Sequence, residues 1–429
     1  MNLTIIGTGY VGLTSGAMFA ELGHRVTCVD TDQEKLATLS SGGVPFFEPG
    51  LDELVKKHLG GNLRFAPDLT SVEHTRAVML AVGTPPAPDG SPDIRYILEA
   101  AGQLAPYLKK YRVIIIKSTV PVGTKKMLQQ HLLNLGIKQK HFSIVSNPEF
   151  LREGSALSDS FNPDRIVIGA DNPKALEITR ALYQKIECPV MITSNEAAEM
   201  IKYAANAFLA TKISFINELA DICEEYNIDI DEVSRGIGYD SRIGRHFLKA
   251  GAGYGGSCLP KDISALRHLA ESAARQTALL QAVNDINNRR PAAIMEKLER
   301  QLGSLEGKKV AVWGLSFKPQ TDDMRFSPAV AVIGMLLEKK AEVMAFDPVA
   351  MDKARGVLPA KVLLASDMYA AADGCDALVI MTEWQAFAGA DLGLLKRSMK
   401  QPVIVDGRNV FSPAEARRNG FHYQGMGRQ

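Results

Sequence analysis

The sequence of 429 residues lacks several features that mark special classes of protein. No apolar run is long enough to span a bilayer, so we expect no membrane protein. Residues 1–7 contain neither a basic segment nor a small-residue cleavage site, so we expect no secretory signal peptide. The five cysteines are odd in number and widely spaced, which argues against a disulfide framework and favours a reducing compartment. We therefore expect a cytoplasmic protein.

An excess of charge of one sign is also missing. The chain has 49 Lys and Arg against 48 Asp and Glu, a formal net charge of +1, and its basic residues are scattered. This balance predicts no nucleic-acid or membrane partner. A hydrophobic fraction of 46% with 23% charged residues is ordinary globular composition. At roughly 150 residues per domain, the length predicts two or three domains.

Short apolar segments alternate with helical patterns in the first part of the chain. They predict buried parallel strands at residues 3–6, 25–29, 77–82, 113–116 and 143–145, with further strands at 165–168 and 190–192. Because helix-like stretches separate many of them, we expect a doubly wound α/β sheet.

The pattern changes at Thr193. Thr193 and Glu196 have capping-box spacing, and from there a helical pattern runs to about Tyr226. Its apolar stripe comprises Ala198, Ile201, Ala205, Phe208, Phe215, Leu219 and Ile222. At ~1.5 Å per residue this helix would be ~45 Å long, enough to bridge two domains or to form the spine of a dimer. More helix follows to about Leu302, interrupted by a glycine-rich stretch at 251–256.

A second α/β region follows the helices. Its predicted strands are residues 310–313, 343–346, 377–381 and 403–405. The predicted fold class is α/β, with two Rossmann-like doubly wound domains joined by a central all-helical connector with one long helix. The predicted boundaries are 1–194, 195–304 and 305–429.

A glycine-rich turn directly follows the first strand. In GTGYVG, Gly7 permits the tight turn, Gly9 lets backbone N–H groups approach a pyrophosphate, and Gly12 lets the helix pack on the strand. Asp30 closes the second strand, where its carboxylate would accept the ribose hydroxyls and repel a 2′-phosphate. The combination predicts an NAD site.

Two further strand ends carry hydroxyl groups. Thr84 and Thr119 lie at the carboxyl edge of the predicted sheet, where such folds bind ligands. Taken alone, each is better explained as a Ser/Thr turn or helix cap. Lys35, on a surface helix, is equally compatible with an adenosine contact and with plain solvation.

The most informative stretch is GYGGSCLPKD, residues 253–262. Its glycines would let the backbone approach a bulky ligand, and Pro260 fits the first position of a helix. Cys258 would then lie at a helix N-terminus with Lys261 one turn on, and both surroundings favour thiolate over thiol. We expect Cys258 to be a nucleophile, whereas the other four cysteines are better explained as inert.

Other polar residues are candidates beside it. Lys202 and Asn206 are four apart on one face of the long helix, and beside an activated cysteine they would hold an oxyanion. A solvated helix surface is the alternative explanation. Glu149 and Glu153 follow a strand end, where at least one is a candidate for orienting water or cofactor. No metal site is predicted.

With these residues together, the chain resembles the family of UDP-glucose and GDP-mannose dehydrogenases. The resemblance covers essentially the whole chain and is closest to the UDP-glucose branch. It rests on GTGYVG, VGTP, KSTVPVGT, SNPEFLREGSA, AEMIKYAANAFLATKISFINE, SRIGRHFLKAG, GYGGSCLPKD, GLSFKP, TDDMR and VDGRN. Several such motifs in the right order are far more specific than any one of them. Departures are small, such as Ser316 where alanine is frequent.

The resemblance implies two successive oxidations of UDP-glucose to UDP-glucuronate with two NAD. Cys258 matches the nucleophile that captures the aldehyde, and Lys202 and Asn206 match the residues that stabilise the oxyanion. Glu149 matches an acid–base residue for the thioester step. The groups that position the reacting water match Thr119 and Asp262.

The resemblance also implies the ligand contacts. The expected NAD site comprises Gly7, Gly9, Tyr10, Val11, Gly12, Asp30, Lys35, Thr84, Thr119, Glu153, Lys261 and Arg325. The expected substrate site comprises Glu149, Phe150, Leu151, Arg152, Glu153, Lys202, Asn206, Arg242, Phe247, Leu248, Lys249, Ala250, Gly251, Gly255, Lys318 and Arg408. Arg242 matches an arginine that reaches across from a partner subunit, so a homodimer built on the long helix is implied.

Three alternatives remain open at this stage. A relative acting on UDP-N-acetylmannosamine or GDP-mannose would share the fold and the thiol. A β-hydroxyacid-type dehydrogenase would need no cysteine and would release one NADH per substrate. A non-enzymatic NAD-sensing protein would have no evident use for Cys258, Lys261 and Lys202.

Overall fold

The computed structural model describes residues 1–87 and 90–428, and the chain divides into two compact units. The first unit comprises Met1–Ala205 with Ser264–Ala274, and the second comprises Asn206–Ile263 with Arg275–Gln429. The three predicted domains have other limits, and their boundaries stay a prediction.

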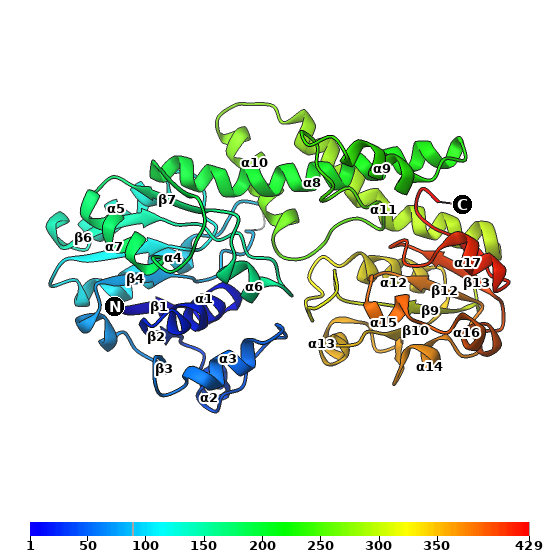
Figure 1. The fold of residues 1–429 in the computed structure, drawn as a ribbon, viewed down its shortest axis with the longest axis horizontal. Coiled ribbons are helices and arrows are strands. Elements are labelled where there is room, and N and C mark those ends of the chain that lie inside the picture. The colour runs from blue at the N-terminus through cyan, green and yellow to red at the C-terminus, as the bar shows by residue number, and fades with distance from the viewer. Residues whose placement is uncertain (88–89, 429) are drawn as a thin grey trace. The chain divides into compact units, whose positions relative to one another are not determined.

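An eight-stranded sheet forms the core of the first unit, with the order β3-β2-β1-β4-β5-β6-β7-β8 (Figure 1). Its strands are β1 (Asn2–Ile6), β2 (Arg25–Val29), β3 (Leu63–Ala66), β4 (Ala77–Leu80), β5 (Arg112–Ile116), β6 (Phe142–Ser146), β7 (Ile166–Ala170) and β8 (Val190–Thr193). The neighbours from β3 to β6 all pair in parallel, which confirms the doubly wound sheet.

The central strands of this sheet are apolar on both faces because each face has its own hydrophobic core. Ile5 and Met79 point into one cluster, and Ile6 and Leu80 into the other. The helices of this unit are α1 (Tyr10–Glu21), α2 (Gln33–Ser40), α3 (Leu51–His58), α4 (Arg95–Leu104), α5 (Thr124–Asn134), α6 (Ala156–Phe161) and α7 (Pro173–Leu182), with 3₁₀ turns η1 (Thr70–His74), η2 (Ala105–Tyr107) and η3 (Gln139–His141).

The last two strands correct the prediction of buried parallel strands. β7 pairs antiparallel with β6, because the connection between them carries only the six-residue α6 and makes no helical crossover. β8 is parallel to β7 but forms the edge of the sheet, so Val190, Met191 and Ile192 are exposed.

The cap of the long helix lies one residue later than expected. Thr193 is the last residue of β8 and pairs with Gly169, so it does not cap the helix. Ser194 does so instead, since its hydroxyl accepts the N–H of Ala197 at 3.2 Å. The helix, α8 (Asn195–Glu225), has 31 residues, and the prediction of one long helix is confirmed.

Part of the predicted apolar stripe on α8 is not buried. Ala198 is fully buried, but Phe208, Phe215 and Ile222 are 66%, 48% and 50% exposed. The other helices of this region are α9 (Ile230–Gly238), α10 (Leu259–Ser272) and α11 (Ala278–Leu302). Among the helices of residues 1–87 and 90–428, none is long and apolar enough to cross a membrane.

A six-stranded, all-parallel sheet forms the core of the second unit, with the order β11-β10-β9-β12-β13-β14. Its strands are β9 (Lys309–Trp313), β10 (Glu342–Phe346), β11 (Leu363–Leu364), β12 (Ala377–Ile380), β13 (Val403–Asp406) and β14 (His422–Gln424). Its helices are α12 (Pro328–Glu338), α13 (Met351–Val357), α14 (Met368–Ala372), α15 (Gln385–Ala388), α16 (Leu392–Ser398) and α17 (Pro413–Arg418). The prediction of a second doubly wound domain is confirmed.

Candidate active site

The glycine turn after β1 has the geometry of a dinucleotide site. Gly7 has a φ of +98°, and a Cβ there would lie 2.7 Å from the carbonyl oxygen of Ala81. A Cβ on Gly12 would lie 1.9 Å from the carbonyl oxygen of Gly7. A Cβ on Gly9, in contrast, would meet no protein atom within 4 Å. Protein packing therefore requires two of the glycines, and the third leaves open the approach to the first N–H groups of α1.

Asp30 lies at the expected end of β2 and contacts the same turn. Its Oδ2 accepts hydrogen bonds from the Thr8 N–H at 2.8 Å and the Thr8 hydroxyl at 2.6 Å. The Lys35 ammonium lies 3.3 Å from the same oxygen. Burial works to raise the pKa of Asp30, but the bonds from Thr8, the Asp32 N–H and the Lys35 charge outweigh it and hold the pKa below its usual range.

Two of the predicted hydroxyl residues come together at the carboxyl edge of this sheet. The Thr84 hydroxyl donates to the carbonyl oxygen of Thr119 at 2.8 Å, which joins the loops after β4 and β5. Ser118 adds a second tie, because its hydroxyl donates to the Val82 carbonyl at 2.6 Å. The edge where the glycine turn lies is thus held by side chains as well as by strands.

Glu149 and Lys202 form a buried ion pair in the first unit. The Lys202 Nζ lies 3.0 Å from Glu149 Oε1, and the two side chains are 4% and 6% exposed. Burial works to raise the pKa of Glu149, but the Lys202 charge and the Leu151 N–H, at 2.5 Å from Oε2, hold it below its usual range. The alternative explanation, in which Lys202 lies on a solvated helix surface, is therefore wrong.

A second buried lysine, absent from the predicted set, lies behind Glu149. Lys117 Nζ donates to the Tyr183 hydroxyl at 3.2 Å and to Asn147 Oδ1 at 3.4 Å, and Tyr183 donates to Asn147 at 2.5 Å. Burial lowers the pKa of Lys117 to about 8, against the opposing effect of Glu149. The only sign of this lysine in the sequence was its position at the start of the KSTVPVGT motif, which also contains Thr119.

The start of α8 contributes two more residues that sequence reasoning missed. Asn195 Oδ1 accepts the Ser146 N–H at 2.8 Å, and Glu199 accepts the N–H groups of Gly123 and Lys125 at 2.7 and 3.1 Å. With Lys202 they occupy positions i, i+4 and i+7, so one polar face of α8 is fixed to the first sheet. The spacing was visible in the sequence, but polar residues at helical spacing are usually a solvated face.

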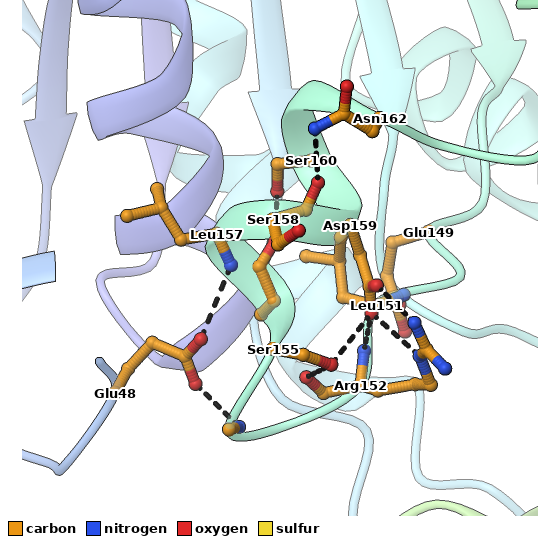
Figure 2. Close-up of polar contacts among 12 residues, drawn as sticks. Glu48, Glu149, Leu151, Arg152, Ser155, Leu157, Ser158, Asp159, Ser160 and Asn162 are labelled. Carbon is orange, nitrogen blue, oxygen red and sulfur yellow. Dashed lines mark hydrogen bonds and ion pairs between the residues drawn. The ribbon is translucent and has the colours of Figure 1, made fainter. Parts of the chain in front are cut away.

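The predicted substrate loop after Glu149 is ordered by charged contacts. The Arg152 guanidinium donates to both oxygens of Asp159, and the Arg152 N–H donates to Asp159 at 3.0 Å (Figure 2). The Phe150 ring has the Arg165 guanidinium 3.6 Å from its centroid and the Lys202 ammonium at 5.5 Å. Glu153, the last residue of the loop, is half-buried.

In the second unit, Cys258 immediately precedes α10, as predicted. The Asp262 N–H donates to the Cys258 carbonyl at 2.9 Å, and the Cys258 Sγ is 3.7 Å from the Ser257 hydroxyl. Asp262 is fully buried, accepts a hydrogen bond from Asn206 Nδ2 at 2.6 Å and has the Lys261 ammonium 2.9 Å from its other oxygen. Cys258, just before α10, Lys261 and Asp262, on its first turn, and Asn206, on α8, are thus four predicted catalytic or cofactor residues of this unit.

Protein packing gives a further reason for the glycines before Cys258, besides the ligand approach that the sequence predicts. A Cβ on Gly255 would lie 2.3 Å from the Phe326 carbonyl oxygen, and one on Gly256 would lie 2.7 Å from the Phe317 ring. A Cβ on Gly253 would lie 2.7 Å from Asn287 Oδ1. The close neighbours are protein atoms, so packing within this unit accounts for the glycines without a ligand.

Arg408 and part of the predicted 247–251 loop also meet in the second unit. The Arg408 guanidinium donates to the carbonyls of Met381, Gly253 and Phe317 at 2.9, 2.9 and 3.2 Å. A Cβ on Gly251 would lie 2.8 Å from the Gly407 carbonyl oxygen, so this glycine lies against the residue before Arg408. Lys318 is next to Phe317, with its ammonium 5.5 Å from that ring.

Two predicted arginines are held by their own neighbours. Arg242 pairs with Asp240 at 2.6 Å and is 87% exposed, and Arg325 pairs with Asp323 at 2.7 Å and is 61% exposed. The backbone near these predicted residues is strained, because left-handed φ values occur at non-glycine residues: Phe247, Gln320, Phe326 and Asn409. Leu248 and Ala250 are buried, and Lys249 is exposed. The described residues contain no cluster of ligands suited to a metal ion.

Comparison with known proteins assigns the whole chain to one family. Residues 1–187, 196–289 and 311–413 match the NAD binding, central and UDP binding domains of the UDP-glucose/GDP-mannose dehydrogenase family. UDP-glucose 6-dehydrogenase TuaD of Bacillus subtilis (strain 168) is 46% identical over all of this chain and 93% of that protein. The chain belongs to this family. The first unit therefore contains the family's NAD binding domain.

Solved structures of other family members have the same fold. A UDP-glucose dehydrogenase from the archaeon Pyrobaculum islandicum superposes with a TM-score of 0.94 at 40% identity, covering 100% of this chain and 98% of that one. A UDP-D-ManNAc dehydrogenase from Pyrococcus horikoshii gives 0.88 at 28% identity, covering 100% and 99%. Within the family, these comparisons favour the UDP-glucose branch.

Proposed function

We propose that this chain is a UDP-glucose 6-dehydrogenase, which oxidises UDP-glucose to UDP-glucuronate with two NAD. The observation that carries the chemistry is Cys258 at the start of α10, beside the buried contact of Asp262 with Asn206 and Lys261. Full-length similarity to UDP-glucose 6-dehydrogenases, at 46% identity for the Bacillus subtilis protein, supports the substrate. The more distant UDP-N-acetylmannosamine and GDP-mannose enzymes make a different sugar the second candidate.

NAD fits the residues of the first unit. The open space at Gly9 would admit the pyrophosphate to the N–H groups of Tyr10 and Val11, and Asp30 would accept the ribose hydroxyls. Bound there, NAD supplies the hydride acceptor for each oxidation. Lys35, Thr84, Thr119 and Glu153 would complete this site.

The thiol separates one four-electron oxidation into manageable steps. After the first oxidation, Cys258 sulfur bonds to C6 of the aldehyde, and the carbonyl electron pair moves to oxygen to give a thiohemiacetal. Loss of a hydride and a proton leaves a thioester. Water then adds to C6 and the C–S bond breaks, which releases the carboxylate and regenerates the thiol.

The buried polar groups serve these steps. Lys202 and Asn206 would stabilise the oxyanion, and an ammonium held 3.0 Å from Glu149 is already positioned rather than free to rotate. Glu149 would move protons in the thioester step, while Thr119 and Asp262 would orient the water. The segment from Glu149 to Glu153 and the 247–251 loop, with Gly255, Lys318 and Arg408, would hold the nucleotide sugar.

The decisive experiment counts NADH. Purified protein with limiting UDP-glucose should release two NADH per sugar, and a panel of nucleotide sugars should give UDP-glucose the highest kcat/KM. Cys258→Ala should lower turnover at least about a thousandfold while NAD still binds. Cys188→Ala, which removes a half-buried thiol elsewhere, is the matched control and should remain active. One NADH per sugar, or full activity without Cys258, would rule the proposal out.

We propose further that two copies associate through α8. Phe208, Phe215 and Ile222 recur every seven residues and are about half exposed or more, as expected for one helix face that a second copy covers. Phe215→Glu should convert the dimer into a monomer in light scattering. If Arg242 acts on the partner's site, mixed dimers of Arg242→Ala and Cys258→Ala chains should recover activity that neither parent has.

The cytoplasm remains the expected location of the protein.

A further inference from the structure

Glu48 belongs to none of the predicted sites. It nevertheless links two parts of the first unit that do belong to them, the cofactor turn and the substrate loop. It lies in the segment between α2 and α3 and is only 5% exposed. Its Oε1 accepts the Leu157 N–H at 3.3 Å, and its Oε2 accepts the Gly154 N–H at 2.6 Å (Figure 2). Glu48 therefore holds the end of the substrate loop that begins at Glu149.

The same carboxylate also holds the first residue of the cofactor helix. The Tyr10 hydroxyl donates to Glu48 Oε2, and Gly154 N–H also reaches the Tyr10 oxygen, at 2.8 Å. Burial, and then the nearby Glu48 charge, raise the pKa of Tyr10, so the phenol keeps its proton and remains a donor. The Phe46 ring, 4.9 Å from that of Tyr10, limits movement of the phenol.

These contacts form one continuous path. Tyr10 follows Gly9 directly, so its backbone belongs to the turn that would receive the pyrophosphate. Its hydroxyl meets Glu48, which meets Gly154, next to Glu153 and the substrate loop. The opposite end of that loop is fixed by the Glu149–Lys202 pair. A shift in the first turn of α1 would therefore reach the loop through one buried carboxylate.

We propose that Tyr10 and Glu48 are positioning residues that couple occupancy of the cofactor turn to the order of the substrate loop. The inference rests on the proposed function for the identity of the sugar ligand. Neither side chain needs to touch the reacting atoms. Cofactor binding should restrain the segment from 150 to 157, which contains the substrate loop and the start of α6, and the restrained loop should bind the nucleotide sugar more tightly.

Tyr10→Phe tests the link with the least disturbance, because it keeps the ring and removes only the hydroxyl. The full chain is titrated with UDP-glucose, with and without saturating NADH, which forms a complex that cannot turn over. NADH should tighten UDP-glucose binding about fivefold or more in the unaltered chain, and less than about twofold in the variant. The KM for UDP-glucose should rise by a larger factor than kcat falls. Tyr111→Phe, which removes another partly buried hydroxyl of this unit, one that contacts Ser143, should keep the full coupling.

Hydrogen exchange with NADH alone tests the link independently of the sugar. NADH should slow exchange of the amides from 150 to 157 in the unaltered chain, and this protection should be lost in Tyr10→Phe and reduced in Glu48→Gln. Unchanged coupling and protection in Tyr10→Phe, even with a lower melting temperature, would leave the two residues a merely structural role and overturn the inference. Loop protection by NADH without any UDP-glucose binding would instead count against the proposed substrate alone.

Discussion

Gly7 directly follows β1 in the first sheet and Gly314 directly follows β9 in the second, and both have a left-handed backbone, with φ of +98° and +91°. An aspartate then follows the neighbouring strand in each sheet. Asp30 accepts the N–H of Thr8, and Asp347 accepts the N–H of Leu315, so each acid holds the residue after the glycine. The strand order β3-β2-β1-β4-β5-β6 in the first sheet also matches β11-β10-β9-β12-β13-β14 in the second. The two sheets therefore share their topology and this hydrogen bond from the turn to the aspartate.

The turns that follow β1 and β9 differ in what they present to a ligand. α1 begins at Tyr10, three residues after Gly7, whereas α12 begins only at Pro328, so the second turn presents no helix N-terminus to a ligand. Asp347 is fully buried and accepts six hydrogen bonds, from Leu315 N, Ser316 N and Oγ, Trp384 Nε1, Val349 N and Ala350 N. A shared glycine and aspartate therefore do not define a dinucleotide site. An open second glycine and a short turn do.

Substitution of a glycine in each turn should show the largest difference between the two sheets, with stability affected in one and NAD affinity in the other. A Cβ on Gly314 would lie 2.4 Å from the Thr382 Cβ at a left-handed φ, so Gly314→Ala should cost about 4 kcal/mol of unfolding free energy and leave NAD affinity unchanged. Gly9→Ala should do the reverse, with stability kept and NAD affinity at least tenfold weaker. Urea unfolding and NAD titration of both variants measure this contrast. If Gly9→Ala bound NAD normally, the first turn would not be the dinucleotide site.

The aspartates should behave in the same opposed way. In Asp347→Asn, the amide group must face backbone N–H donors, and leaving them unpaired should cost about 3 kcal/mol without changing the KM for NAD. Asp30→Asn should be milder for stability, but it should weaken NAD binding and narrow the discrimination against NADP. Thermal unfolding with cofactor kinetics reads both effects. Equal losses of NAD affinity in the two variants would contradict the assigned difference.

Part of the fold could be predicted from the sequence. Strands and the long helix were predictable because their apolar periods are local. The NAD turn was predictable because Gly7, Gly9, Gly12 and Asp30 stand in a short, fixed pattern. The antiparallel β7, the exposed edge strand β8 and the short strands β3, β11 and β14 were not, since strand direction and edge position depend on partners distant in the sequence.

The candidate site divides along the same line. Cys258 stands out because its helix start and Lys261 are adjacent in the sequence. Glu48, Lys117 and Glu199 do not, because their roles come from contacts with residues far along the chain. The packing that requires Gly255 and Gly256 was not predictable for the same reason, since the carbonyl and the ring that lie against them come from residues 326 and 317.

The two sheets should also differ in the sign of a pH effect. Burial raises the pKa of Asp406, at the end of β13, to about 6, against hydrogen bonds from Phe411, Arg408 and Tyr423. A raised carboxyl pKa gives a stability contribution that is full below the unfolded value, near 4, and declines as pH rises to about 6. The lowered pKa of Asp30 gives a contribution that is present above the unfolded value and lost as pH falls.

Unfolding free energies from about pH 2.5 to 7.5 test these signs. Replacing Asp406 with Asn adds a constant cost from one unpaired N–H, but it should remove a decline of at most roughly 3 kcal/mol across the window. Asp30→Asn should instead remove a rise in stability with pH that lies at the acid end, below about pH 4. The difference between each variant and the unaltered chain isolates the single group. Parallel curves for the chain and Asp406→Asn would show that this carboxyl does not titrate there.

The smallest expected effect concerns the periphery of the first turn. Lys35 is partly exposed and lies 3.3 Å from Asp30 and 3.9 Å from Asp32, so solvent screens its charge. Lys35→Gln should weaken NAD binding less than about threefold at low salt, and the difference should shrink as salt is added. Lys353, which pairs with Asp322 at 2.9 Å in the second unit, gives a matched Gln variant that should leave NAD binding unchanged. A salt-independent, tenfold loss in Lys35→Gln would contradict this weak, screened contribution of the Lys35 charge.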